Sequence, residues 1–179
     1  QVVIFEAGPL AGGMMRFGIP KYRLPREVLE AEVQRIVDMG VELRLNTKVD
    51  DILATMKEEK FDASFLAVGA HIAKRTAIPA AESAKILDAV SVLRSMEGED
   101  KPLLGRRVVV YGGGNTAIDV ARTAKRLGAE EAMIVYRRTR EKMPAHDFEV
   151  QEALDEGILI KWLSTIKQAG EGSITVERM

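Results

Sequence analysis

The chain has 179 residues, of which 46% are hydrophobic and 30% are charged, and its formal net charge is −1. This composition is typical of a soluble globular protein, and the near-neutral charge gives no electrostatic basis for binding nucleic acid or an anionic membrane. Cysteine is absent, which excludes disulfides, thiolate metal sites, iron–sulfur ligation and a redox-active cysteine pair within these residues.

Two further absences limit the expected function. Histidine occurs only at positions 71 and 146, so we expect no metal site. No apolar run is long enough to span a bilayer, and the chain opens on an apolar strand pattern rather than on a secretory signal. We therefore expect a cytoplasmic protein. Because the apolar strand pattern begins directly after Gln1, we also expect this chain to be a piece of a longer protein.

The first predicted strand is the apolar run Val2–Phe5, which ends on Glu6. Residues 8–25 are rich in Gly, Pro and Met and too long for a tight turn, and loops of this kind commonly carry function. A helix with one apolar face is predicted over 25–39, opened by its proline, and a strand follows over 41–45.

The middle of the chain is less regular. A short helix is predicted over 51–59 and a buried strand over Phe61–Val68, with Gly69 just beyond it permitting a close backbone approach. The chain then becomes mixed and polar, with one predicted helix over 87–96. We interpret residues 71–104 as a connection between two domains.

A glycine-rich turn follows the predicted strand Val108–Tyr111, and a helical pattern then runs to a stop at Gly128. A second strand is predicted over Ala132–Tyr136. This order of strand, turn, helix and strand supports interpreting Gly112, Gly114 and Ala117 as a dinucleotide-binding fingerprint. The phosphates would lie on the helix N-terminus, where N–H groups are free. The predicted phosphate-binding residues are Gly112, Gly113, Gly114, Asn115 and Thr116.

The end of the second strand indicates which dinucleotide is bound. A carboxylate there accepts a hydrogen bond from the ribose 2′-hydroxyl of NAD or FAD, whereas this chain has Arg137 and Arg138. Guanidinium groups bind phosphate bidentately, so these arginines, with Arg140 close behind, favour NADP(H) over NAD(H). The alternative is a solvated basic turn, since Arg140 and Lys142 continue the positive run.

The two halves of the chain share a repeat. Residues 32–34 and Gly40 match residues 149–151 and Gly157 at a constant offset of 117 positions, and a strand pattern follows each glycine. Two copies of one dinucleotide-binding architecture would explain the match, and chance similarity of two β-α units is the alternative.

In this alignment the run Val2–Glu6 corresponds to Ala132–Arg137. The first copy ends its strand on Glu6, a residue type that accepts from a ribose 2′-hydroxyl. One copy would then select a dinucleotide without a 2′-phosphate and the other a dinucleotide with it, which fits FAD and NADPH. An exposed strand-end carboxylate is the alternative interpretation of Glu6.

Four segments together resemble the glutamate synthase small (β) subunit and its relatives. They are Gly12–Pro25, Leu66–Ala70, Val108–Ala129 and Tyr136–Ala145. The resemblance implies an α/β, three-layer Rossmann-like dinucleotide-binding fold of the disulfide-reductase type, with an NADP domain inserted into an FAD domain. It further implies that NADPH gives a hydride to FAD, and that electrons pass through iron–sulfur clusters outside this chain to a partner subunit or domain.

The resemblance also implies a set of flavin-binding positions. Glu6 would bind the FAD ribose, and Val49 would contact the adenine through its backbone. The other residues expected to line the FAD are Gly13, Arg16, Gly18, Ile19, Pro20, Ala67 and Gly69. No catalytic acid, base or nucleophile is expected, because hydride transfer depends on the geometry and electronics of the cofactors.

The expected organisation is a partial FAD-binding domain over 1–70, the connecting segment 71–104, and an NADP-binding domain over 105–179 that is incomplete at its C-terminal end. The parent protein would be the enzyme, and this piece alone is expected to be inactive. The alternative is a non-catalytic NADP(H)-binding sensor or scaffold module, which would lack the yellow colour of a bound flavin. The electron acceptor, the direction of electron flow and the oligomeric state stay open.

Overall fold

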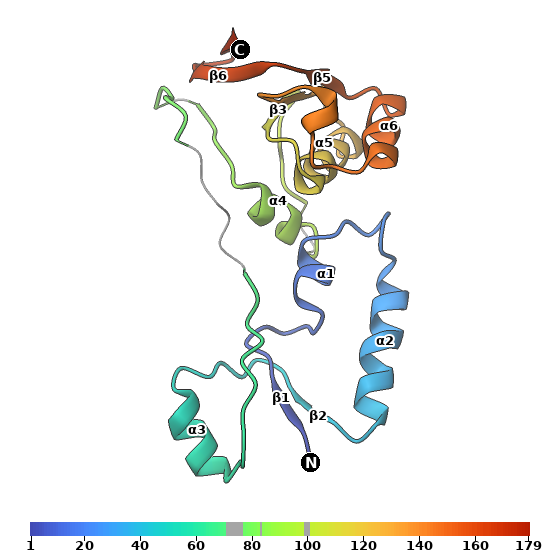
Figure 1. Ribbon diagram of the computed structural model, residues 1–179, viewed down its shortest axis with the longest axis vertical. Coiled ribbons are helices and arrows are strands. Elements are labelled where there is room, and N and C mark those ends of the chain that lie inside the picture. Colours follow the sequence, from blue (N-terminus) through green and yellow to red (C-terminus); the bar gives the residue numbers. More distant parts are fainter. Residues whose placement is uncertain (71–76, 83, 99–100) are drawn as a thin grey trace. The chain divides into compact units, whose positions relative to one another are not determined.

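The computed structural model describes residues 1–70, 77–82, 84–98 and 101–179. The chain divides into two compact units, Gln1–His71 (unit 1) and Ile72–Met179 (unit 2). Each unit combines helices with parallel strands, so the predicted α/β class is confirmed (Figure 1).

Unit 1 is built on two short parallel strands, β1 (Val3–Phe5) and β2 (Glu42–Arg44), with Ile4 opposite Leu43. Between them the chain forms α1 (Gly13–Phe17) and α2 (Arg26–Asp38), and after them α3 (Ile52–Glu59). The predicted helices over 25–39 and 51–59 are therefore confirmed. The loop expected over residues 8–25 is interrupted by the single helical turn of α1, which the sequence analysis missed.

The strand predicted over Phe61–Val68 is wrong. The segment makes no strand among the described residues, and its apolar side chains face water, with Phe65 93% exposed and Leu66 69% exposed. An apolar run becomes a strand only when a neighbouring strand pairs with its backbone. In the described part of unit 1, β1 and β2 pair with each other and nothing pairs with this run.

Unit 2 contains a three-stranded parallel sheet of β3 (Arg107–Tyr111), β4 (Glu131–Val135) and β5 (Leu159–Lys161), in that order. The helix α5 (Asn115–Arg126) connects β3 to β4 and packs on both strands. The 3-10 turn η1 (Arg140–Lys142) and α6 (Asp147–Asp155) connect β4 to β5, and α4 (Ala89–Ser95) packs on α5. Figure 1 shows α5 and α6 side by side.

Close packing of α5 on the sheet follows from its small residues. Ala121 and Ala124 have no exposed surface, and Ile118 is 1% exposed. Ile118 and Ala121 meet Ala132 and Ile134 of β4 in one apolar cluster. Because alanine lets a helix approach a strand closely, the glycine-rich turn that precedes α5 is held firmly at the carboxyl end of β3.

A C-terminal hairpin, β6 (Ser164–Ala169) with β7 (Ile174–Arg178), completes unit 2 and was not predicted. A single parallel bridge joins Ala80 to Ala169 of β6, where the N–H of Ala81 donates to the carbonyl of Ala169 at 2.8 Å. The hydroxyls of Tyr111 and Thr165 lie 2.8 Å apart, so the hairpin also supports the end of β3. Alternating residues from Ile174 onward, after a Gly-Ser turn, were the missed signal.

The backbone confirms the internal repeat. The N–H of Glu6 donates to Arg44 and the N–H of Tyr136 donates to Lys161, both at 2.9 Å, and the two acceptors are 117 positions apart. The carbonyls of Glu6 and Tyr136 accept from the N–H groups of Thr47 and Ser164, which are also 117 positions apart.

This register corrects the predicted alignment of the two copies. Glu6 is structurally equivalent to Tyr136, not to Arg137, because the two residues make the same pair of backbone hydrogen bonds at the end of their strands. Arg137 therefore lies one position beyond the place of the acid in the first copy.

Candidate functional site

The glycine turn lies between β3 and α5, at the carboxyl end of the parallel sheet. Gly112 has a φ of +156° and a β-carbon added there would lie 3.5 Å from the β-carbon of Ala117, so helix and turn are in direct contact. Gly114 is the N-cap of α5, and a β-carbon added there would meet nothing within 4 Å. The turn therefore presents open space above it.

The N-terminus of α5 offers hydrogen-bond donors to that space. The first N–H groups of a helix have no carbonyl partner within it, and Gly114 has no side chain that could accept from them. The fit of this turn to a pyrophosphate therefore rests on free donors and on the absence of a β-carbon at the cap. Thr116 is exposed and Asn115 is half-buried beside these donors.

Arg137 and Arg138 follow β4 at the same edge of the sheet. Both side chains are exposed, and neither makes a hydrogen bond or an ion pair with the residues that the structure describes. The backbone of this turn is fixed, because the carbonyl of Arg138 accepts from the N–H of Leu163 at 3.2 Å. Two uncompensated guanidinium groups on a held backbone suit an anionic ligand.

Arg140 is placed differently from the other two arginines. Its guanidinium forms an ion pair with Asp147 of α6 at 2.8 Å, and its side chain is 34% exposed. The next residue, Glu141, has its pKa lowered by a hydrogen bond from Thr139, by its own backbone N–H and by the neighbouring cations. Arg140 thus belongs to the same turn as Arg137 and Arg138, the arginine turn (residues 137–140), but it has a carboxylate partner.

The start of α6 also contacts the start of α5. The N–H of His146 donates to the side-chain oxygen of Asn115 at 3.2 Å, and the N–H of Ala145 donates to the carbonyl of Gly113 at 3.1 Å. The segment between η1 and α6 therefore forms one wall of the glycine turn. Sequence spacing gave no sign of this contact, because the partners are more than 30 residues apart.

An ion-pair network around the buried Arg122 holds α6 against α5. Arg122 donates to Glu152 at 2.6 Å and to Glu156 at 2.7 Å, and Arg126 donates to Glu156 at 2.6 Å. Partial burial of Glu156 opposes its ionisation, but the hydrogen bonds from both arginines outweigh this and hold its pKa below the ordinary value of 4.5. The network therefore joins the C-terminal halves of α5 and α6.

In unit 1, Glu6 lies directly after β1 and is half-buried. Its carboxylate accepts from the N–H of Gly8 at 2.8 Å, which leaves the second oxygen for a ligand hydroxyl. The loop after β2 comes beside it, since the N–H of Asn46 donates to the carbonyl of Gly8 at 2.9 Å. Val49 lies three residues further along this same loop.

The other predicted flavin residues form a separate group around α1. Arg16 is buried, donates to the carbonyl of Ala11 at 2.7 Å and pairs with Glu30 at 3.4 Å. Arg26 donates to the carbonyls of Arg16 at 2.6 Å and Ile19 at 2.8 Å. The predicted residues brought together here are Gly13, Arg16, Gly18, Ile19 and Pro20. Arg26, which organises the loop, was missed because a surface arginine at a helix start has no distinctive sequence signal.

Ala67 and Gly69 are not brought to either group. They lie in the exposed segment 61–70, and Gly69 has a φ of +67°. The histidine at position 71 falls outside the described residues. Within the part of the chain that is described, no group of three or more His, Asp or Glu side chains is placed to hold a metal ion. No helix there is both long and apolar enough to cross a bilayer.

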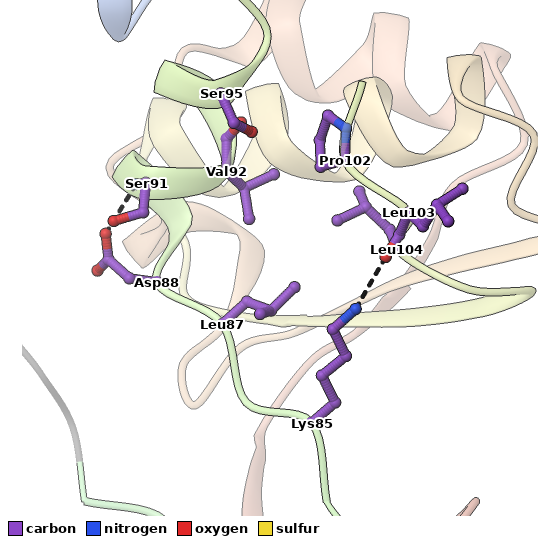
Figure 2. A pocket seen from close by; sticks show the side chains of 9 residues that line it. All are labelled: Lys85, Leu87, Asp88, Ser91, Val92, Ser95, Pro102, Leu103 and Leu104. Carbon is purple, nitrogen blue, oxygen red and sulfur yellow. Dashed lines mark hydrogen bonds between the residues drawn. The ribbon is translucent and has the colours of Figure 1, made fainter. Parts of the chain in front are cut away.

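A pocket of about 330 Å³ lies beside α4 and contains none of the predicted site residues. Figure 2 shows its apolar walls, among them Leu87, Val92 and Leu104. The ammonium of Lys85 donates to the carbonyl of Leu103 at 2.9 Å, and Asp88 accepts from the N–H of Ser91 at 2.8 Å. With these charged groups already bonded, the pocket offers little to a phosphate, and the glycine turn is the better candidate site.

The strand–turn–helix geometry has a match among known families. The sequence profile of the pyridine nucleotide-disulphide oxidoreductases matches residues 22–178, which is nearly all of unit 2 and the part of unit 1 that follows α1. The chain belongs to this family. The pyridine nucleotide-disulphide oxidoreductase fold accounts for the parallel sheet, and the resemblance to the glutamate synthase small subunit and its relatives is confirmed by individual proteins.

Among curated relatives, the chain is 42% identical over 167 residues to the NADP(+)-dependent formate dehydrogenase subunit beta of Moorella thermoacetica, covering 91% of this chain and 24% of that protein. It is 35% identical over 179 residues to the glutamate synthase [NADPH] small chain of Escherichia coli (strain K12), covering 90% of this chain and 37% of that protein. The chain therefore spans between a quarter and two-fifths of the length of these relatives.

Solved structures confirm the Rossmann-like fold. A 2-naphthoyl-CoA reductase complex superposes with a TM-score of 0.76 at 18% identity, covering 99% of this chain and 26% of that one. Thioredoxin reductase of T. acidophilum superposes with a TM-score of 0.56 at 13% identity, covering 93% of this chain and 57% of that one. At these identities the likeness concerns the fold.

Proposed function

We propose that this chain carries the NADPH-binding site of a flavoprotein oxidoreductase. The observation that carries the proposal is the pair Arg137 and Arg138, which have no anionic partner among the described residues and lie at the same sheet edge as the glycine turn. The names of the relatives, which include NADP(+) or NADPH, support the same choice of dinucleotide.

The residues of unit 2 would bind and orient the dinucleotide. The pyrophosphate would lie over Gly114 and the first N–H groups of α5, while Arg137 and Arg138 would hold the 2′-phosphate. When bound, NADPH would supply a hydride, which carries two electrons, for reduction of the flavin. We assign no proton-transfer role to this chain, because none of the site groups needs to act as an acid or a base.

The flavin is proposed to be FAD, with part of its site in unit 1. Glu6 has one carboxylate oxygen available at the end of β1, and the loop organised by Arg26 presents the positions from Gly13 to Pro20. We further propose that the electrons then pass to iron–sulfur clusters or to a partner subunit outside these residues, since relatives are named as subunits. A cytoplasmic location stays a prediction.

The decisive experiment is calorimetric titration with NADPH and, separately, NADH at low and moderate salt. We expect tighter binding of NADPH that weakens as salt rises, because phosphate–guanidinium attraction is screened. The double change Arg137→Ala with Arg138→Ala should raise the NADPH dissociation constant at least about tenfold, since one charge-assisted hydrogen bond contributes about 1.5–3 kcal/mol.

The matched control is Arg106→Ala. Arg106 is exposed and lies at the opposite, amino-terminal end of β3, where it bonds Glu130 at 2.8 Å. This change removes one exposed guanidinium group away from the candidate site and should leave NADPH binding unchanged. Equal affinity of the unaltered protein for NADPH and NADH would refute the assignment of the arginines. A full-length protein that binds NADPH but shows no flavin absorbance would instead indicate a sensor or scaffold module.

A further inference from the structure

Tyr136 contacts both parts of the candidate site, the glycine turn (residues 112–114) and the arginine turn. It is the residue between β4 and Arg137, and it is 7% exposed. A β-carbon added to Gly113 would lie 2.9 Å from Cζ of Tyr136 and would overlap two other ring carbons. The ring therefore rests directly against the middle residue of the glycine turn, and only glycine fits there.

The hydroxyl of the same side chain fastens the arginine turn. It donates to the carbonyl oxygen of Lys142 at 2.6 Å. Tyr136 and Lys142 stand at the two ends of the turn that carries Arg137, Arg138 and Arg140, so this hydrogen bond closes the turn. Trp162 holds the ring from another side, with ring centroids 6.3 Å apart in an edge-to-face arrangement.

The internal repeat allows Tyr136 to be compared with its counterpart in the first copy. Tyr136 occupies the place that Glu6 has in the first copy, as their matched backbone hydrogen bonds show. The Glu6 carboxylate accepts a hydrogen bond from the N–H of Gly8 and so holds the backbone after its strand. The Tyr136 hydroxyl, which is uncharged, donates to the carbonyl of Lys142 and so holds the arginine turn. A neutral group at this place avoids the repulsion that a carboxylate would exert on a nearby phosphate.

We propose that Tyr136 is a positioning residue for dinucleotide selectivity, and that its hydroxyl aligns the arginine turn with the glycine turn so that both reach one NADPH. This inference rests on the proposed function. It assigns the choice between NADPH and NADH not only to the arginines but also to an uncharged side chain that holds them in place.

The test compares Tyr136→Phe with Tyr111→Phe. Tyr136→Phe keeps the ring against Gly113 and removes only the bond to Lys142. Tyr111→Phe removes a comparable hydroxyl contact, to Thr165 at 2.8 Å, at the end of the neighbouring strand. Dissociation constants for NADPH and NADH are measured by calorimetry for both variants and for the unaltered protein.

Tyr136→Phe should raise the dissociation constant for NADPH roughly twofold to tenfold, the range for one hydrogen bond. The constant for NADH should change less than about twofold, because the arginine turn is expected to contact only the 2′-phosphate. Tyr111→Phe should preserve the ratio of the two constants. An unchanged ratio in Tyr136→Phe overturns this inference while the proposed function stands. An unaltered protein without preference for NADPH overturns both.

Discussion

Units 1 and 2 contain the same strand–helix–strand connection but bury it to different extents. In unit 2 the β4–β5 connection belongs to a three-stranded sheet covered by α5, and Ala132, Ile134 and Val135 have no exposed surface. In unit 1 the β1–β2 pair stands without a third strand among the described residues, and Ile4 is 41% exposed. The shared backbone register shows that pairing geometry is set locally, whereas burial depends on what surrounds the pair.

We expect the largest effect when isoleucine is replaced by alanine at equivalent strand positions in each unit, which tests the difference in burial. Ile134→Ala should lower the free energy of unfolding of unit 2 by about 2–5 kcal/mol, because it leaves a cavity in a closed core. Ile4→Ala should have a much smaller effect, because this side chain is already partly in water. Trp162, the single tryptophan, lies in unit 2 and reports its unfolding by fluorescence during a denaturant titration.

Ile4→Ala should leave the tryptophan transition in place, and its effect should appear only in amide hydrogen exchange of β1 and β2. If both variants shifted the tryptophan transition equally, the two units would have to share one cooperative core. That result would contradict the conclusion that the two units differ in burial.

A second pair of variants compares the ion pairs of the two units. Arg122→Gln removes a guanidinium whose side chain is 6% exposed and leaves Glu152 without its partner and Glu156 with only Arg126. We expect a loss of about 3 kcal/mol, at the lower end for buried pairs since the carboxylates still contact water. Denaturant unfolding followed at Trp162 measures this loss.

The matched change in unit 1 is Arg44→Gln. Arg44 bonds Glu42 at 2.6 Å and Glu59 at 2.8 Å, and these hydrogen bonds raise its pKa, but its side chain is 32% exposed. Solvent screening should make this change nearly neutral, with unaltered hydrogen exchange in α3. Strong deprotection of α3 would show that surface pairs matter more in the less buried unit.

The smallest expected effect is a pH dependence confined to unit 2. The pKa of Glu156 is lower in the folded protein than in the unfolded chain, so its ion pairs stabilise unit 2 at neutral pH. This stabilisation is lost as the pH falls from 4.5 through the lower folded value. Glu156→Gln should therefore reduce stability at neutral pH and flatten its decline in acid.

Thermal unfolding at a series of pH values measures this slope. Glu130→Gln, which alters an exposed carboxylate bonded to Arg106, is the matched control and should keep the slope of the unaltered protein. If stability declines with the same slope at low pH in Glu156→Gln and in the unaltered protein, other carboxylates are responsible for the acid sensitivity.

The regular elements could be predicted where hydrophobic periodicity and stop signals agree. The helices α2 and α5 and the strands β3 and β4 fall within a residue or two of their predicted ranges, since glycines or proline mark their ends. The segment 61–68 was mispredicted because its apolar run lacks a pairing partner here. The β6–β7 hairpin was missed because its strands are largely polar and carry only a weak apolar pattern.

The sequence alone determined the family, the glycine fingerprint and the arginines that follow the second strand, because each depends on residue types at short spacings. Only the tertiary structure decided that Tyr136, not Arg137, takes the place of Glu6, and that Arg140 pairs with Asp147. It also brought His146 to Asn115, across 31 positions of the chain. Contacts of this kind follow from strand register and helix packing, which are fixed only when distant segments fold against one another.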